Sequence, residues 1–181
     1  MPTTDTQPVY LPAPAAGARP WRLRGGTRKT VLVLHIASAG AWLGIDVVIG
    51  VLVFTALLTG SDRTKALCYQ ALELFAVWPL LATGLLCLAT GVLLGLGSKY
   101  GLVRFWWVAV KLVLNIVLSG LVLVALRPTV ADAAARAGDF LAGGAPDLGV
   151  GDLIFPPVVS TGALVFATLL SVFKPWGRIR R

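Results

Sequence analysis

The chain has 181 residues, of which 57% are hydrophobic and only 13% are charged, and its formal net charge is +8. Soluble domains carry roughly 25% charged residues, so this composition excludes an ordinary soluble protein and predicts an integral membrane protein in contact with the lipid bilayer. The positive charge lies mainly in the tails beside apolar segments, where it directs topology, and we expect no nucleic-acid partner.

The chain begins with a tail that has few apolar side chains to bury. Residues 1–29 contain five prolines, few large apolar residues and five basic residues near their end. Such a segment cannot offset the entropy of ordering, so we expect disorder. The apolar run that follows, 31–58, has 28 residues. A secretory signal has an apolar core of about 7–15 residues, so this run is predicted to stay as a membrane anchor.

Four segments are long and apolar enough to cross a bilayer, which takes about 20 residues. They cover about 31–58, 74–96, 105–126 and 154–173. Backbone groups in hydrocarbon must be satisfied within the segment, so each is predicted to be a helix. The predicted fold is all-α, an integral membrane four-helix transmembrane bundle over 30–176. Pro79 is expected to kink the second span, and Pro156 and Pro157 suit the first turn of the fourth.

Lysine and arginine counts predict the orientation. The two tails and the 98–104 loop hold eleven of them, whereas the loops on the other side hold four. The positive-inside rule therefore places both termini in the cytoplasm. The basic tail 177–181 then lies inside with the first tail.

The third loop, 127–153, is predicted to lie outside the membrane. Apolar residues recur there at helical spacing (Val130, Ala134, Ala137 and Leu141). This spacing predicts a short amphipathic helix on the outer surface, followed by a glycine-rich turn. The aspartates of the loop match no calcium-binding spacing, so we interpret them as a solvated acidic surface.

Three ionisable residues fall inside the predicted spans: His35, Asp46 and Lys111. Such side chains are costly in a bilayer and usually face the bundle interior or a cavity. At about 1.5 Å per residue, His35 lies roughly 8 Å and Lys111 roughly 9 Å from the inner ends of their helices, and Asp46 lies roughly 24 Å deep. His35 and Lys111 are therefore expected to share a level in the cytoplasmic leaflet.

Polar residues line one stripe on each of two helices. His35, Trp42 and Asp46 share a stripe of the first span, and the third span has a second stripe of Lys111, Asn115 and Ser119. If the stripes face each other, they form a polar seam in which Asp46 bonds Asn115 or Ser119. The alternatives are structural: Lys111 reaches the headgroups, His35 bonds a neighbouring helix, and Trp42 packs in the core.

Small residues and cysteines complete the pattern. Gly40 and Gly44, and likewise Gly91 and Gly95, are spaced for close approach between helices. Cys68 and Cys87 have neither a metal-binding spacing nor a context that favours a disulfide.

The first span carries the pattern L-H-x6-W-x-G, and the third carries W-x3-K-L-x-L, which contains Lys111. Together they resemble a superfamily of small bacterial membrane proteins that includes the copper-resistance protein D family and the HemJ-type protoporphyrinogen oxidases. The chain is most similar to actinobacterial four-helix members of unknown function. The resemblance implies a bacterial inner-membrane location, haem b at His35 and a role in activity for Lys111.

The same resemblance has limits that can be seen in the residues. The further histidines of the oxidase family have no counterpart, because His35 is the only histidine. Ligation of haem by two histidines would therefore require a homodimer. Copper is less favoured, since Cu(I) prefers thiolate or thioether ligands and the only methionine is Met1.

Three functional hypotheses follow. The first is a haem- or metal-associated protein with His35 as the ligand, Lys111 beside an anionic group and Trp42 near the cofactor. The second is an accessory or scaffold subunit of a larger membrane complex. The third is a small transporter or proton path through Asp46, Asn115 and Ser119. The chain has no nucleotide-binding loop and no recognisable pair of nucleophile and base, so we expect no catalytic residues.

Overall fold

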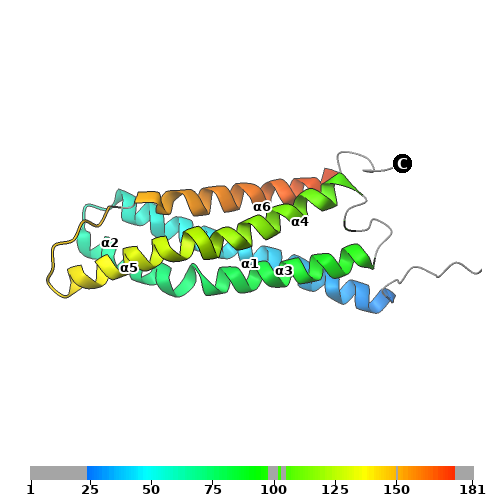
Figure 1. Cartoon of the computed structure of the whole chain (residues 1–181), viewed down its shortest axis with the longest axis horizontal. Coiled ribbons are helices and arrows are strands. Elements are labelled where there is room, and N and C mark those ends of the chain that lie inside the picture. Colours follow the sequence, from blue (N-terminus) through cyan, green and yellow to red (C-terminus); the bar gives the residue numbers. More distant parts are fainter. Residues whose placement is uncertain (1–23, 98–101, 103–104, 150, 174–181) are drawn as a thin grey trace, which may run out of the picture.

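The computed structural model describes residues 24–97, 102, 105–149 and 151–173. These residues form helices and no strand (Figure 1). The elements in chain order are α1 (Gly25–Leu58), α2 (Asp62–Phe75), α3 (Trp78–Leu96), α4 (Trp106–Leu121), the π-helix η1 (Val122–Leu126), α5 (Arg127–Leu141), the 3-10 helix η2 (Gly151–Ile154) and α6 (Phe155–Phe173).

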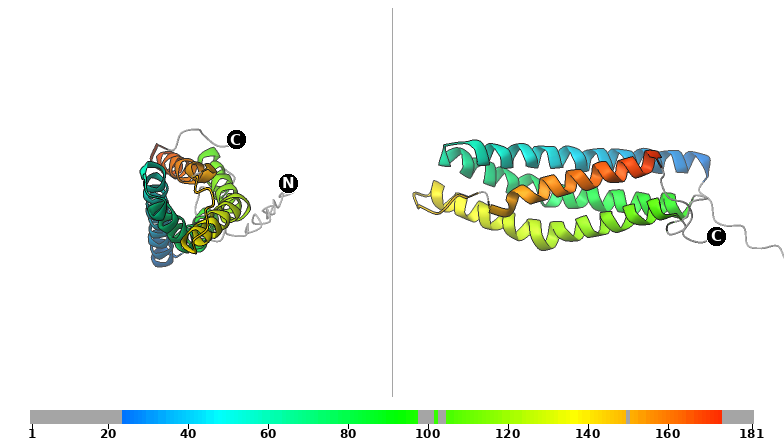
Figure 2. Two further views of the ribbon diagram at one scale, coloured as in Figure 1. Left: turned by 90° about the vertical axis from the view of Figure 1, so that its left-hand side faces the viewer. Right: turned by 90° about the horizontal axis from the view of Figure 1, so that it is seen from above.

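These elements form four long rods. α2 continues into α3, and α4 continues through η1 into α5, so that four helical segments are long and apolar enough to cross a membrane. The predicted all-α, four-helix membrane bundle is therefore confirmed. α1 packs on α3 and α6, and α4 packs on α3 and α6. The end view in Figure 2 shows this ring, in which α1 and α4 face each other across the bundle.

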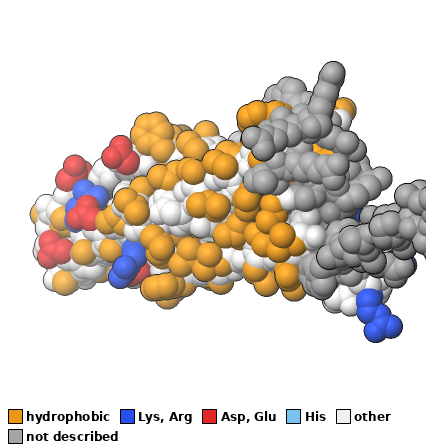
Figure 3. Space-filling view, turned by 45° about the vertical axis from the view of Figure 1, so that its right-hand side comes forward, with side chains coloured by type: hydrophobic (Ala, Val, Ile, Leu, Met, Phe, Trp, Pro, Cys, Tyr) orange, Lys and Arg blue, Asp and Glu red, His pale blue; other side chains and the backbone are white. Residues whose placement is uncertain are grey.

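The bundle is taller than a bilayer at one end. α3 and α6 have 19 residues each, which at about 1.5 Å per residue matches a hydrocarbon thickness of about 30 Å. α1 has 34 residues, or roughly 51 Å. The surplus lies at the end where α1 meets α2. We name this the outer end and the opposite one the inner end, as labels alone, and define the outer cap as the end of α1, α2, α5 and residues 142–149. Figure 3 shows charged side chains gathered at this end and an apolar surface over the middle of the bundle.

The segment 127–153 contains the predicted short helix, which is α5. This helix continues the rod of α4 and η1, which the sequence did not predict. Its apolar side, which includes the buried residues Val130, Ala133 and Ala137, packs against α2. An amphipathic helix needs an apolar partner, and α2 supplies one because Ala66, Tyr69 and Leu72 are buried along its facing side.

The segment between the first two predicted spans is also helical. Only residues 59–61 connect α1 to α2. Ser61 caps α2, because its side chain accepts a hydrogen bond from the backbone N–H of Thr64 (3.3 Å). The predicted spans end at residue 58 and resume at residue 74, whereas α2 already begins at Asp62.

The first helix begins earlier than predicted. α1 begins at Gly25, so residues 25–29 belong to the helix. The earlier part of the tail and the basic tail 177–181 lie outside the described residues. The first turn of α1 and the last turn of α6 lie at the same end of the bundle, opposite the outer cap (Figure 1).

Proline residues account for the breaks in the rods. Pro79 is in the first turn of α3, and residues Ala76 and Val77 separate α2 from α3. Pro128 follows η1, where the Arg127 N–H bonds the Val122 carbonyl five residues earlier. A proline has no N–H and its ring crowds the carbonyl four residues before it, so the helix widens at this point. Pro156 and Pro157 lie in the first turn of α6, as predicted.

The outer cap should depend on a single buried tyrosine. The Tyr69 hydroxyl donates to the Leu148 carbonyl (2.8 Å), and the Tyr69 side chain is fully buried. Tyr69→Phe leaves that carbonyl unpaired, so we expect the free energy of unfolding to fall by about 1 kcal/mol. Thermal unfolding in detergent measures this loss, and hydrogen exchange in 142–149 should become faster. The exposed neighbour Gln70→Ala is the control, and equal behaviour of the two variants would contradict a packed cap.

Candidate functional site

A buried carboxyl group lies in the interior of the bundle. Asp46 of α1 is 2% exposed, and its Oδ2 accepts a hydrogen bond from the Ser160 hydroxyl of α6 (2.7 Å). The predicted partners, Asn115 and Ser119, are on α4, so this prediction is wrong. The reason is the order of helices around the ring, because α6 is a neighbour of α1 whereas α4 lies opposite.

Asp46 and Ser160 line a cavity of about 280 Å³ near the outer end of the membrane-spanning helices. The cavity has a buried floor, which includes both residues and the apolar side chains of Ile49, Leu80 and Leu118. A site of this kind, mostly apolar with a few convergent polar groups, is the usual form of a small-molecule site. It is therefore the main candidate functional site.

The rim of the cavity lies between α6 and its neighbour, the rod formed by α4 and η1. Phe155 and Val159 of α6 are exposed on one side, and Leu121 and Ala125 are exposed on the other. Asp152 of η2 stands at the outer end of the rim and is also exposed. The cavity therefore opens on the side of the bundle, from the level of Asp152 down into the apolar belt.

The π-helix shapes this opening. Val122, Ala125 and Leu126 of η1 all line the cavity. A π-helix places an extra residue in its turn and separates side chains that an α-helix would stack, and such turns occur often at functional sites. The irregular turn that precedes Pro128 therefore forms part of the cavity wall.

Trp42 lies one turn below Asp46 in the core. The Trp42 side chain is 1% exposed. A Cβ atom placed on Gly84 of α3 would lie 3.0 Å from the indole and 3.2 Å from the Ser119 hydroxyl of α4. The absence of a side chain at Gly84 thus lets the indole reach across α3 towards α4. Its Nε1 is buried and has no hydrogen-bond partner among the described residues.

The α4 stripe continues this polar interior towards the inner end. The Ser119 hydroxyl donates to the Asn115 side-chain oxygen (3.4 Å). One turn further in, the Lys111 Nζ donates to the Ser171 hydroxyl of α6 (2.9 Å) and lies 4.7 Å from the Trp107 ring centroid. Lys111 of the predicted stripe therefore bonds α6, whereas Ser119 lies beside Gly84 of α3, where the Trp42 indole of the α1 stripe also packs.

His35 is held against α3. Its Nδ1 lies 3.0 Å from both the Cys87 carbonyl oxygen and the Thr90 hydroxyl. A carbonyl only accepts hydrogen bonds, so this contact requires Nδ1 to carry the proton. Gly91 makes room for the ring, because a Cβ atom there would lie 3.1 Å from Cε1. The Nε2 atom makes no hydrogen bond to any described residue.

The two members of the predicted His/Lys pair have different partners. His35 bonds α3, whereas Lys111 bonds α6 and Trp107. Within the described part of the chain, no group of three or more histidine, cysteine or acidic side chains is placed to hold a metal ion. His35 is the only histidine in the sequence, and the haem hypothesis stays a prediction.

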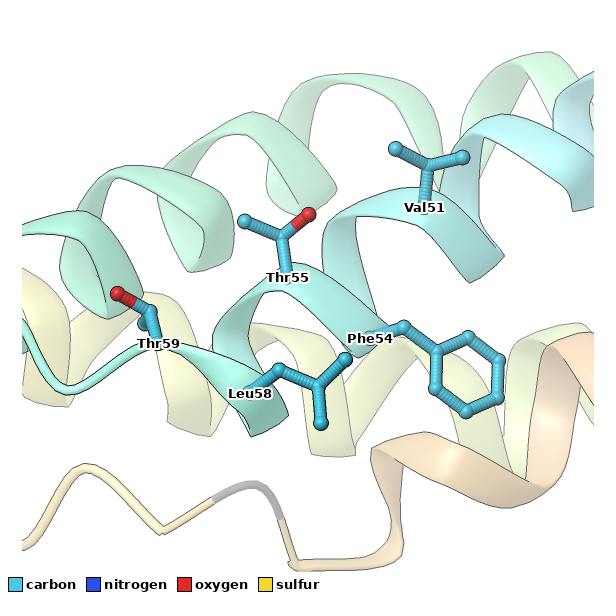
Figure 4. A pocket seen from close by; sticks show the side chains of 5 residues that line it. All are labelled: Val51, Phe54, Thr55, Leu58 and Thr59. Atoms are coloured by element: carbon cyan, nitrogen blue, oxygen red, sulfur yellow. The ribbon is translucent and has the colours of Figure 1, made fainter.

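A second hollow lies on the outer end of α1 (Figure 4). Its lining side chains are Val51, Phe54, Thr55, Leu58 and Thr59, all from α1 and the turn that follows it. The hydroxyl groups of Thr55 and Thr59 are its only polar side-chain groups. Since it holds no ionisable group, it offers less chemistry than the Asp46 cavity.

The two predicted glycine pairs have different surroundings in the structure. Gly91 and Gly95 are sites of close approach, to His35 and Leu102 respectively. At Gly40 and Gly44, an added Cβ atom would meet nothing within 4 Å. Gly40 and Gly44 therefore do not provide a close contact between helices in the described part of the chain.

Comparisons with known protein families, with curated proteins and with solved structures gave no match to this chain.

Sequence reasoning missed the two serines of α6 that hold the ionisable groups. Ser160 binds Asp46 and Ser171 binds Lys111. They are 11 residues apart in the sequence, which places them on one side of a helix at 3.6 residues per turn. This spacing is the signal in the sequence that identifies them.

The contact of Trp42 with Gly84 gives a stability prediction. In Gly84→Ala the new methyl group would press on the rigid indole, so we expect the free energy of unfolding to fall by about 1–3 kcal/mol. The matched control is Gly120→Ala on α4, where an added Cβ atom meets nothing within 4 Å and helix propensity favours alanine. Thermal unfolding in detergent measures both variants. A Gly84→Ala protein as stable as Gly120→Ala would contradict the packing described.

Proposed function

We propose that this multi-pass membrane protein is a small transporter that moves protons through the interior of its bundle, with Asp46 as the group that takes up and releases them. The observation that carries the proposal is the position of Asp46, which is buried yet lines a cavity that reaches the exposed rim at Asp152. Ionisable residues inside membrane bundles commonly mark ion pathways or proton relays.

The environment of Asp46 supports this role. A carboxyl group away from water is costly unless it is paired or hydrogen-bonded, and Asp46 has only the Ser160 hydroxyl as a hydrogen-bond partner among the described residues. The described ion pairs are elsewhere, at Lys65–Asp62 and Arg136–Asp132. A cation held permanently against Asp46 would neutralise it, so this arrangement leaves the carboxyl able to exchange a proton.

Polar groups continue from Asp46 towards the inner end. They are the unpaired Trp42 Nε1, the Ser119–Asn115 pair and the Lys111–Ser171 pair. The interior thus offers hydrogen-bonding groups at successive helical turns below the cavity. Water molecules that join such groups can carry protons between them, and buried polar groups without protein partners are where ordered water usually binds.

Proton flux into proteoliposomes tests the proposal. With a potassium diffusion potential set by valinomycin and a pH-sensitive dye inside, wild-type protein should raise proton entry above that of empty liposomes. Asp46→Asn keeps the size of the side chain but cannot carry the proton charge, so we expect flux to fall to the empty-liposome level.

Asp132→Asn is the matched control, because Asp132 is exposed on α5 in a surface ion pair and should keep wild-type flux. Both variants must elute as monodisperse protein with wild-type thermal stability before their fluxes are compared. Wild-type flux no greater than that of empty liposomes, or undiminished flux in Asp46→Asn, would refute the proposal.

The geometry of His35 favours a second candidate function, binding of haem b. A metal-ligating histidine usually donates its other ring N–H to a carbonyl or carboxylate, which orients the ring. His35 has this arrangement, with Nδ1 against the Cys87 carbonyl and Nε2 without a partner among the described residues. Trp42 is too deeply buried to flank a ligand at the surface of α1 and α3.

An absorption spectrum tests this candidate. Protein purified in detergent and supplemented with haem b should show a Soret band, and His35→Ala should lose it. Thr90→Ala removes a neighbour of the ring without removing the ligand, so it should keep the band. A missing band in the wild type, or the same band in His35→Ala, would exclude His35 as a haem ligand.

The proposed orientation follows from charge alone. The end of the bundle opposite the outer cap joins the two basic tails, so the positive-inside rule favours a cytoplasmic location for that end. The outer cap and the mouth of the Asp46 cavity would then lie on the external side. A bacterial inner membrane remains the proposal that the family resemblance supports.

A further inference from the structure

The Asp46 cavity has acidic groups but no described basic group. Among the residues that line it, only Asp46 and Asp152 are ionisable. The Asp46 Oδ2 accepts from Ser160, while Oδ1 makes no hydrogen bond to a described residue. A ligand that carries a positive charge would therefore find a counter-ion at the floor and a second acidic group at the rim, whereas an anion would meet repulsion at both.

The walls of the cavity require that most of the ligand be apolar. Apart from the two aspartates, the polar side chains of the lining are only Thr129 and Ser160. An inorganic cation without its water shell needs several oxygen ligands around one point, whereas the two carboxyl groups of this lining are divided between the floor at Asp46 and the rim at Asp152. The volume of about 280 Å³ is at the low end for small-molecule sites, so it suits a compact molecule.

The direction of entry is from the side. Ala125, Phe155 and Val159 are exposed at the rim and belong to helical segments of the apolar belt. Molecules with an apolar body and one charge concentrate at the boundary between headgroups and hydrocarbon. A path from that boundary to Asp46 passes between η1 and α6, which are the two walls of the opening.

We propose that the cavity binds a compact apolar molecule that carries one positive charge, such as an organic ammonium ion, with the Asp46 carboxylate as its counter-ion. This inference rests on the proposed function, since it gives the transporter a substrate class at the same carboxyl group. The positive charge of the molecule determines where it binds, and the apolar walls determine which apolar groups fit beside that charge.

Binding of tritiated benzyltrimethylammonium to the full chain in lipid nanodiscs tests the inference, with empty nanodiscs subtracted. We expect saturable binding that weakens roughly tenfold or more in Asp46→Asn, because a desolvated charge pair is lost. Ala125→Trp, which narrows the rim but keeps the carboxyl, should also weaken binding. Asp132→Asn should bind like the wild type. Neopentylbenzene, which has the same shape without the charge, should not compete.

Several results would overturn the inference: no saturable binding, equal competition by neopentylbenzene, or wild-type affinity in Asp46→Asn. The proton-flux assay separates this inference from the proposed function. Cation binding without proton flux supports the ligand site and refutes the proton path. Proton flux without cation binding supports the path and refutes the ligand class.

Discussion

A carboxyl group that leaves water must be hydrogen-bonded or paired, and Asp46 meets this requirement through one bond from Ser160. The bond joins the first and last long helices of the chain, so it lies where the ring of helices closes. An apolar residue at either position would bury at less cost. The interaction therefore both joins α1 to α6 and places polar groups in the floor of the cavity.

The cavity lies where the rod next to α6, formed by α4, η1 and α5, is irregular. Pro128 cannot donate to the carbonyl four residues before it, and the chain adjusts with the π-helix η1. Beyond this turn, the same rod continues as α5 and packs on α2 to form the outer cap. The rod is thus firmly held at its outer end while its widened turn borders the Asp46 cavity. A regular helix would present its side chains to α6 at a different angle.

Two polar sites lie at different levels of the bundle and use different neighbours. Near the inner end, His35 is bound by α3 through Cys87 and Thr90, and Lys111 is bound by α6 through Ser171. Near the outer end, Asp46 is bound by α6. Each group forms its described interhelical hydrogen bond with a neighbouring helix. The sites can therefore be changed separately, and substitutions in one need not disturb the other.

Hydropathy in the sequence determined the four-helix membrane fold, and helical spacing placed Trp42 and Asp46 on one face of the first span and a short helix within 127–153, because each depends on residues close together in the chain. Only the tertiary structure decided that Ser160 rather than Asn115 binds Asp46, that α5 packs on α2, and that η1 borders a cavity. These contacts depend on which helices are neighbours in the ring. Helical periodicity shows which residues share a face, but it does not show which helix that face meets.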